Sequence, residues 1–126
     1  SMSVEVIWDD EERTVIRWIL EGQFTWEDYE EASTRAFKMH AEVDHLFTTI
    51  FDLRELTSLP SQTITHFPKL STDIPEKQAQ IIVVGGAQRF LVTLGRIFSR
   101  VYHKVQFTST LEEAYDLAAA VQRAES

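Results

Sequence analysis

The segment that most constrains the fold is a short apolar run that ends in two glycines. Residues 79–84 are almost wholly apolar and rich in β-branched side chains, and Gly85-Gly86 ends the run. A helical pattern over residues 87–102 and a strand pattern over residues 104–107 follow. An uncharged strand bounded by glycines and followed by a helix is typical of a parallel sheet covered by helices. The sequence therefore predicts an α/β layer architecture with the apolar run as its central strand.

Hydrophobic periodicity predicts the remaining elements. Two strand patterns near the N-terminus flank an acidic turn at residues 9–12, so we expect them to form an antiparallel hairpin. The strands are expected at residues 4–8, 13–22, 47–53, 79–84 and 104–107, and the helices are expected to begin near residues 25, 59, 87 and 110. The predicted order is β-β-α-β-α-β-α-β-α, which makes a mixed five-stranded sheet with four helices in a single domain over residues 3–124.

The first two predicted helices carry local signals. Thr25 can accept a hydrogen bond from the open amides of the first helix, and Asp28 follows three residues later, a near match to a capping box. The apolar face of this helix is expected to comprise Trp26, Tyr29, Ala32, Ala36, Met39 and Val43. The second helix, over residues 59–73, is expected to be broken, because Pro68 would clash with the carbonyl four residues earlier.

The charge of the chain is acidic and uneven. The formal net charge is −8, which argues against nonspecific nucleic-acid binding. Residues 1–60 hold 14 acidic and 5 basic residues, a net charge of −9, and residues 61–126 have a net charge of +1. Such asymmetry predicts one acidic face, which either steers a protein partner or simply keeps the protein soluble.

The composition also limits the compartment and the chemistry. The chain has no cysteine, which excludes disulfides, thiolate metal sites and thiol catalysis and is compatible with a reducing cytoplasm. No apolar run approaches the roughly 18 residues that a membrane span needs. The N-terminal residues show no basic segment followed by an apolar one, so no secretory signal is expected. We therefore predict a cytoplasmic protein without a membrane span.

Three sequence patterns resemble those of a known family. Residues 50–57 resemble a strand ending in an apolar-Asp-Leu-x-x-Leu/Val run, and residues 81–86 resemble the strand that follows it. Residues 105–107 and 110–114 resemble a short last strand followed by an acidic helix start. Over nearly its whole length the chain is similar to the STAS family, which includes bacterial anti-sigma-factor antagonists, sulfate-transporter tail domains and SpoIIAA-like proteins. The resemblance implies a non-enzymatic regulatory domain that binds a protein partner, such as a regulatory kinase-like protein.

The chain departs from this family at its phosphorylation motif. The antagonists carry an Asp-Ser-Ser/Thr-Gly run at the start of the second helix, whereas residues 60–63 here are Pro-Ser-Gln-Thr. Ser61 keeps a hydroxyl at the expected helix start, where open backbone amides favour a phosphate. Ser61 is therefore the candidate for phosphorylation, and the alternative is an ordinary first-turn serine. The chain resembles a divergent, SpoIIAA-like member of the family.

The expected partner-facing residues lie at the start of the second helix and on the basic helix after the glycines. They are Ser58, Ser61, Gln62, Arg89, Arg96 and Arg100. The helix over residues 87–102 is apolar around more of its circumference than one stripe. Phe98 and Tyr102 are therefore candidates for a partner or homodimer contact, unless a neighbouring helix covers them.

Other candidate sites have weaker signals. Gly85 and Gly86 could present amides to an anion or small ligand, or could form a tight structural turn. His40 and its neighbours do not have the spacing of metal ligands, and a charged surface histidine near a helix C-terminus is the expected role of His40. Asp52 ends a strand, as does the structural residue at the matching position of the STAS family. We therefore predict no enzymatic activity, no metal and no cofactor.

A second function remains open from the sequence. The broken helix over residues 59–73 could leave a pocket against the sheet, which would make the chain a carrier of a small molecule or lipid. The aromatic side chains that could line such a pocket are Phe51, Phe67, Phe90 and Phe98. If these rings instead interdigitate in a closed core, the carrier role is excluded.

Overall fold

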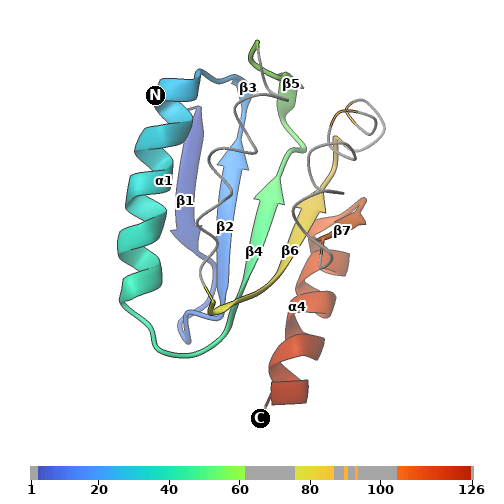
Figure 1. Cartoon of the computed structure of the whole chain (residues 1–126). Coiled ribbons are helices and arrows are strands. Elements are labelled where there is room, and N and C mark those ends of the chain that lie inside the picture. Colours follow the sequence, from blue (N-terminus) through green and yellow to red (C-terminus); the bar gives the residue numbers. More distant parts are fainter. Residues whose placement is uncertain (1–2, 62–75, 87–89, 91–92, 94–104, 126) are drawn as a thin grey trace.

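The computed structural model describes residues 3–61, 76–86, 90, 93 and 105–125 (Figure 1). Within these residues the chain forms a five-stranded sheet, a two-stranded sheet and two helices. The main sheet consists of β1 (Val4–Trp8), β2 (Val15–Leu20), β4 (Phe47–Asp52), β6 (Gln78–Val84) and β7 (Val105–Thr108), and the small sheet consists of β3 (Gly22–Gln23) and β5 (Leu56–Ser58). The helices are α1 (Trp26–Ala41) and α4 (Leu111–Glu125).

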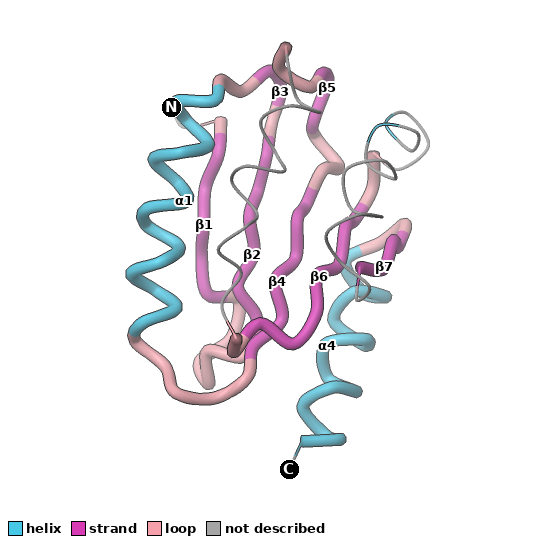
Figure 2. The backbone as a smooth tube through the Cα atoms, in the orientation of Figure 1, coloured by secondary structure: helices cyan, strands magenta, loops and turns pink. Residues whose placement is uncertain are grey.

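The main sheet is mixed, as the sequence predicts. Its strands lie in the order β1-β2-β4-β6-β7, with β1 antiparallel to β2 and every other neighbouring pair parallel (Figure 2). The hairpin therefore forms one edge, and the parallel strands follow it across the sheet in chain order. The carboxyl ends of β4, β6 and β7 consequently meet at the same edge.

Two apolar layers enclose the sheet. Side chains of α1 pack with Ile16, Phe47, Ile81 and Val83 in one cluster, whereas side chains of α4 pack with a second cluster on the opposite face. That second cluster contains Val15, Ile50, Ile82, Val84, Ala114 and Ala118. Consecutive residues of β6 alternate between the clusters, and residues 81–84 are at most 2% exposed. The prediction that this strand is shielded on both faces is confirmed.

The structure corrects three details of the sequence-based prediction. The central strand is β4 and not β6, because the β1–β2 hairpin lies on one side of β4 whereas β6 and β7 both lie on the other. The pairing of β3 with β5 was not predicted, and Ser58 ends a strand instead of entering a helix. Residues 59–61 are also not helical, and most of the two middle helices predicted over residues 59–73 and 87–102 lies outside the described residues.

The start of α1 has the predicted cap in full. Thr25 Oγ1 accepts a hydrogen bond from the Asp28 amide at 3.0 Å, and the Asp28 carboxylate accepts one from the Thr25 amide at 3.3 Å. The predicted apolar face is confirmed as well, because Tyr29, Ala32 and Ala36 are buried. The cap and the buried face together fix where the helix begins and which side packs on the sheet.

Thr25→Ala is expected to lower the free energy of unfolding by about 1 kcal/mol, because it removes the side-chain acceptor of the cap. Thr34→Ala is the matched control, since Thr34 is an exposed residue inside the same helix and alanine has the higher helix propensity there. Urea unfolding monitored by circular dichroism measures both changes. Equal stability of the two variants would mean that the cap does not hold the helix start.

Candidate functional site

The carboxyl-terminal edge of the sheet brings together Asp52 and the Gly85-Gly86 turn, which were both candidates from the sequence. In α/β sheets, ligands commonly bind beyond this edge. Here Asp52 ends β4, Arg54 follows it, and Gly85-Gly86 follows the neighbouring β6. The parallel register aligns Asp52 with Val84, so the residues after both strands are adjacent.

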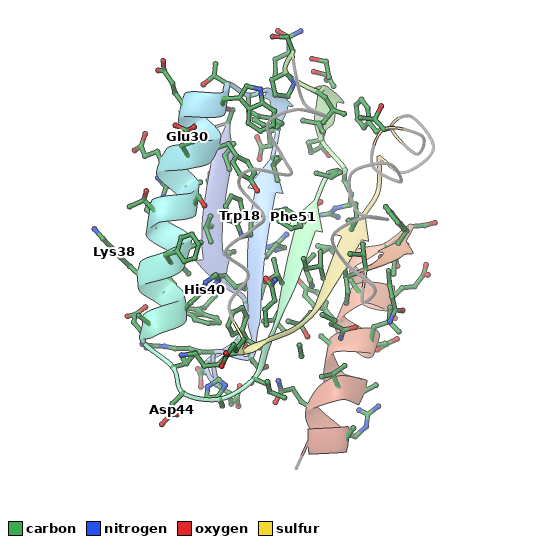
Figure 3. All side chains as sticks on the ribbon, in the orientation of Figure 1. Trp18, Glu30, Lys38, His40, Asp44 and Phe51 are labelled. Atoms are coloured by element: carbon green, nitrogen blue, oxygen red, sulfur yellow. The ribbon has the colours of Figure 1, made fainter. Side chains whose placement is uncertain are left out.

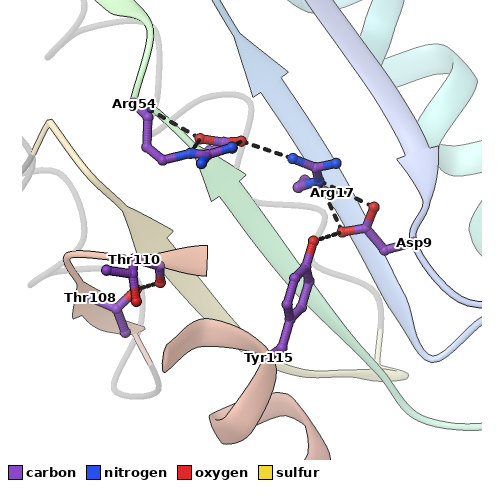
Figure 4. Close-up of polar contacts among 7 residues, drawn as sticks. Asp9, Arg17, Arg54, Thr108, Thr110 and Tyr115 are labelled. Carbon is purple, nitrogen blue, oxygen red and sulfur yellow. Dashed lines mark hydrogen bonds and ion pairs between the residues drawn. The ribbon is translucent and has the colours of Figure 1, made fainter. Parts of the chain in front are cut away.

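Asp52 is the centre of this edge, and it is only 3% exposed. Its carboxylate accepts hydrogen bonds from Arg54 Nε and Nη2, both at 2.9 Å, and from the Arg54 amide at 3.2 Å (Figure 4). Arg17 Nη1 on β2 donates to the same carboxylate at 3.0 Å. Four donors from two arginines therefore surround one buried carboxylate, which is the condition under which a buried charge is tolerated.

The ion pairs continue from β2 to α4. Arg17 also pairs with Asp9 at 2.9 Å, and the hydroxyl of Tyr115 on α4 donates to Asp9 at 2.8 Å (Figure 4). We call these five side chains the Asp52 network: Asp9, Arg17, Asp52, Arg54 and Tyr115. The network links the end of β1, the middle of β2, the end of β4 and the first turns of α4, so it ties distant parts of the chain together.

The electrostatics of the Asp52 network favour its ionised form. Burial alone would raise the pKa of Asp52, but the hydrogen bonds and charge of Arg54, together with the hydrogen bond from Arg17, outweigh burial and hold that pKa below its ordinary value. Burial lowers the pKa of Arg17, but the negative charge of Asp9 raises it, and the net effect is a raised pKa. Burial and the hydrogen bond to Asp9 raise the pKa of Tyr115. A carboxylate held ionised by two cations is a poor proton donor or acceptor near neutral pH, so Asp52 is suited to structure, as the sequence suggested.

Gly85 and Gly86 form the tight turn that was one of their two predicted roles. Their φ angles are +67° and +63°, in the left-handed region that favours glycine. A Cβ on Gly85 would lie 2.8 Å from Arg54 Cγ, and one on Gly86 would lie 3.2 Å from the Leu53 carbonyl oxygen. The Gly85 amide already donates to the Thr108 carbonyl at 3.0 Å. The glycines therefore allow close packing of the strand ends, and a role in anion binding stays a prediction.

The segment that precedes the predicted second helix is held in place. β5 pairs with β3, and the Gly22 amide donates to the Glu55 carbonyl at 2.9 Å. Trp26 Nε1 at the start of α1 donates to the Ser61 carbonyl at 2.7 Å. Ser58 is half-buried and Ser61 is exposed, so the Ser61 side chain is accessible on a fixed backbone. The other predicted partner-facing residues, Gln62, Arg89, Arg96 and Arg100, lie outside the described residues.

The predicted role of His40 as a charged surface residue is wrong. His40 is 9% exposed, its ring stacks on Phe47 with centroids 4.6 Å apart, and neither ring nitrogen has a hydrogen-bond partner among the described residues. Burial, together with the charge of Lys77, lowers its pKa to about 4. Figure 3 shows His40 directed from α1 toward the sheet. In the described segments, no three His, Cys, Asp or Glu side chains are grouped so that they could hold a metal ion.

The aromatic side chains on the α1 face contact one another. The ring centroid of Phe51 lies 5.4 Å from that of Trp18, and both residues are labelled in Figure 3. The ring centroid of Trp18 lies 5.1 Å from that of Tyr29. Phe51, one of the four rings proposed to line a carrier pocket, is thus partly buried and packs against the core cluster. Phe90 packs against the same cluster, and Phe67 and Phe98 lie outside the described residues. The part of this face that the structure describes is therefore a packed aromatic layer.

Comparison with known proteins gives no family for this chain. No protein-family model matches it, and no curated protein matches its sequence. Neither of the described helices has the length and apolar character needed to cross a membrane.

Sequence reasoning identified Asp52 but not its partners. Arg17 interrupts an otherwise apolar strand, and a charged side chain in a largely buried strand needs a counter-ion. The position of Arg17 in this strand therefore indicates that it has an acidic partner, but it does not indicate which residue that partner is. Asp9 was interpreted only as part of an acidic turn and Tyr115 only as part of a helix, although both join the Asp52 network.

Proposed function

We propose that this chain is a non-enzymatic, STAS-like regulatory domain that acts by docking to a protein partner. The observation that carries the proposal is the saturation of Asp52, whose carboxylate accepts bonds from two arginines at 2.9–3.2 Å. Reactive groups in active sites are held ready for substrate, whereas these charges bind one another. Because the charges of the Asp52 network are bound to one another, we infer that the domain functions through its surface.

The STAS-like part of the proposal rests on motifs and topology. The patterns at residues 50–57 and 105–114 are similar to those of the family. A hairpin that leads into parallel strands, with a C-terminal helix on one face, is the arrangement that this resemblance implies. We also propose that the complete domain has four helices and that the protein is cytoplasmic.

The proposed docking surface comprises Ser58, Ser61 and Gln62 together with Arg89, Arg96 and Arg100. Its described part is preformed, because β5 is paired with β3 and the Ser61 carbonyl is bound by Trp26. A preformed surface loses little conformational entropy on binding. A phosphate on Ser61 would add negative charge to this surface, which is how a regulatory kinase-like partner would switch it.

Photo-crosslinking in the native cells tests this function. A benzophenone amino acid at Ser61 is expected to crosslink to one protein, because the Ser61 side chain is exposed on the docking surface. The same amino acid at Glu30, exposed on the outer side of α1 (Figure 3), is the control and is expected not to capture that protein. Identical products from both positions, or no protein product from Ser61, would contradict the proposal.

Native mass spectrometry of the intact chain separates this function from the carrier. If the chain is a docking domain, the native spectrum is expected to show only the mass of the polypeptide, of its oligomer or of its complex with another protein. A small-molecule adduct that disappears on denaturation would favour a carrier with a pocket against the sheet. The denatured sample also shows whether the chain carries a phosphate, and fragmentation of the phosphorylated chain shows whether Ser61 is the modified residue.

A further inference from the structure

A groove lies between the β1–β2 turn and α4, and this turn is at the opposite end of the sheet from β5 (Figure 1). Its volume is about 590 Å³, which is in the range of small-ligand and peptide side-chain sites. Two segments far apart in the sequence form its walls. It is lined by Asp9, Asp10, Glu12, Thr14 and Val15 on the turn side and by Tyr115, Ala118, Ala119, Gln122 and Arg123 on the helix side.

The floor of the groove is apolar and fixed. Val15 and Ala118 are buried there in the core cluster shared by the sheet and α4. The small side chains of Ala118 and Ala119 leave the space open on the helix side. The turn side is rigid as well, because the Asp10 carboxylate accepts from the Thr14 amide at 2.9 Å and the Val15 amide at 3.0 Å. A rigid apolar floor favours an extended apolar stem of an incoming side chain.

The rim of the groove is acidic on its turn side. Asp9 is neutralised by Arg17 within the Asp52 network, and Asp10 is bound to the turn amides. Glu12 is exposed, and its carboxylate has no hydrogen bond or ion pair among the described residues. Asp10 and Glu12 thus leave negative charge on the turn side of the groove, in the half of the chain whose net charge is −9. Among the described residues, Arg123 is the one cation of the groove lining; it lies on the helix side and already has an interaction of its own.

We propose that this groove binds an arginine- or lysine-bearing segment of a partner protein. The alkyl stem of the basic side chain lies on Val15, Ala118 and Ala119, and its cationic head reaches the carboxylates of the turn. The acidic N-terminal half accelerates the approach of such a segment. This second surface requires neither Ser61 nor the STAS resemblance, and its occupant is defined by charge and shape.

A titration followed by amide NMR tests the groove with a defined probe. The peptide ARLRA is expected to shift the amide signals of residues 9–15 and 115–123 at low salt, whereas the acidic peptide AELEA is not. Glu12→Lys is expected to weaken ARLRA binding at least about fivefold, because it reverses the free charge of the rim. Ala119→Trp is expected to abolish binding by filling the groove from an exposed helix position.

Glu30→Lys is the matched control, because it makes the same charge change on α1, outside the groove lining. It is expected to change ARLRA binding less than about twofold, as distant exposed charges are screened. Equal weakening by Glu30→Lys and Glu12→Lys would show general charge attraction and overturn the proposal. Shifts of the groove signals on simple dilution would also overturn it, because they would show that a second copy of this chain occupies the groove. Failure of the Ser61 crosslink leaves this titration unaffected, so the two proposals are tested separately.

Discussion

Asp52→Ala is expected to lower the free energy of unfolding by about 3 kcal/mol or more. The substitution removes the acceptor of Arg17 Nη1 and of three Arg54 donors while leaving the arginines in place (Figure 4). The loss affects Arg17 more than Arg54, because the Arg17 side chain is only 17% exposed. Its positive charge stays partly buried after one of its two counter-ions has been removed. Urea unfolding at neutral pH, with the far-ultraviolet spectrum as a check on the fold, measures the loss.

Asp44→Ala is the control for this prediction. Asp44 is exposed after α1 (Figure 3) and is expected to change stability by less than about 0.5 kcal/mol. The pH dependence gives a second readout, because the folded-state pKa of Asp52 is lowered. The stability that Asp52 provides is present above the pKa of the unfolded chain and is lost as the pH falls through the folded-state pKa. If Asp52→Ala behaved like Asp44→Ala, the Asp52 network would not hold the sheet edge.

His40 is expected to make the protein lose about 3 kcal/mol of stability between pH 6.5 and pH 4. Its pKa is lowered from 6.5 to about 4 by burial and by Lys77, so the unfolded chain binds a proton in this range and the folded chain does not. The contribution of neutral His40 is complete above pH 6.5 and disappears as the pH approaches 4. The charge cannot be accommodated easily, because the Lys77 ammonium donates to the His40 carbonyl at 3.1 Å.

His40→Phe is expected to flatten the stability profile over this range, because phenylalanine keeps a ring against Phe47 and cannot take up a proton. Thr34→Ala is the control, because it changes an exposed residue of the same helix without removing a titratable group, and it is expected to leave the shape of the profile unchanged. NMR titration of the wild-type imidazole signals measures the pKa without any substitution. A His40 pKa near 6.5 would contradict the buried, neutral assignment.

Local signals were enough to predict much of the fold. The strands over residues 4–8 and 47–53 and the start of α1 were predicted because alternation, apolar runs and capping residues act over a few neighbouring positions. Thr25 and Asp28 form the expected cap because both partners are within one turn. The last helix likewise begins after Thr110, whose hydroxyl accepts from the Glu113 amide at 3.1 Å.

The features that the sequence did not predict depend on long-range contacts. β3 and β5 are too short to show a period, and they form because Gly22 meets Glu55 and Leu56 across the end of the sheet. His40 follows the helical period of α1, but its burial results from the approach of Phe47 and Lys77. A helix C-terminus normally favours a charged histidine, and here desolvation by the core outweighs that preference.

The candidate site likewise contains one residue that a local pattern indicated and partners that only long-range contacts determine. Asp52 was interpreted as structural from its place at a strand end, but its partner Arg17 is 35 positions away and Tyr115 is 106 positions from Asp9. No local pattern specifies such pairs. They are set by the order of strands in the sheet and by where α4 packs on it.

A double-mutant cycle between Arg17 and Asp52 tests most directly whether the Asp52 network stabilises the sheet. The free energies of unfolding of Arg17→Met, Asp52→Ala and the double variant are compared with that of the wild type. We expect a coupling energy of at least about 1.5 kcal/mol, because either partner alone is left with a poorly compensated charge. A coupling energy within about 0.5 kcal/mol of zero would contradict this expectation. The charges of Arg17 and Asp52 would then be available for other chemistry, and a docking domain would no longer be the favoured function.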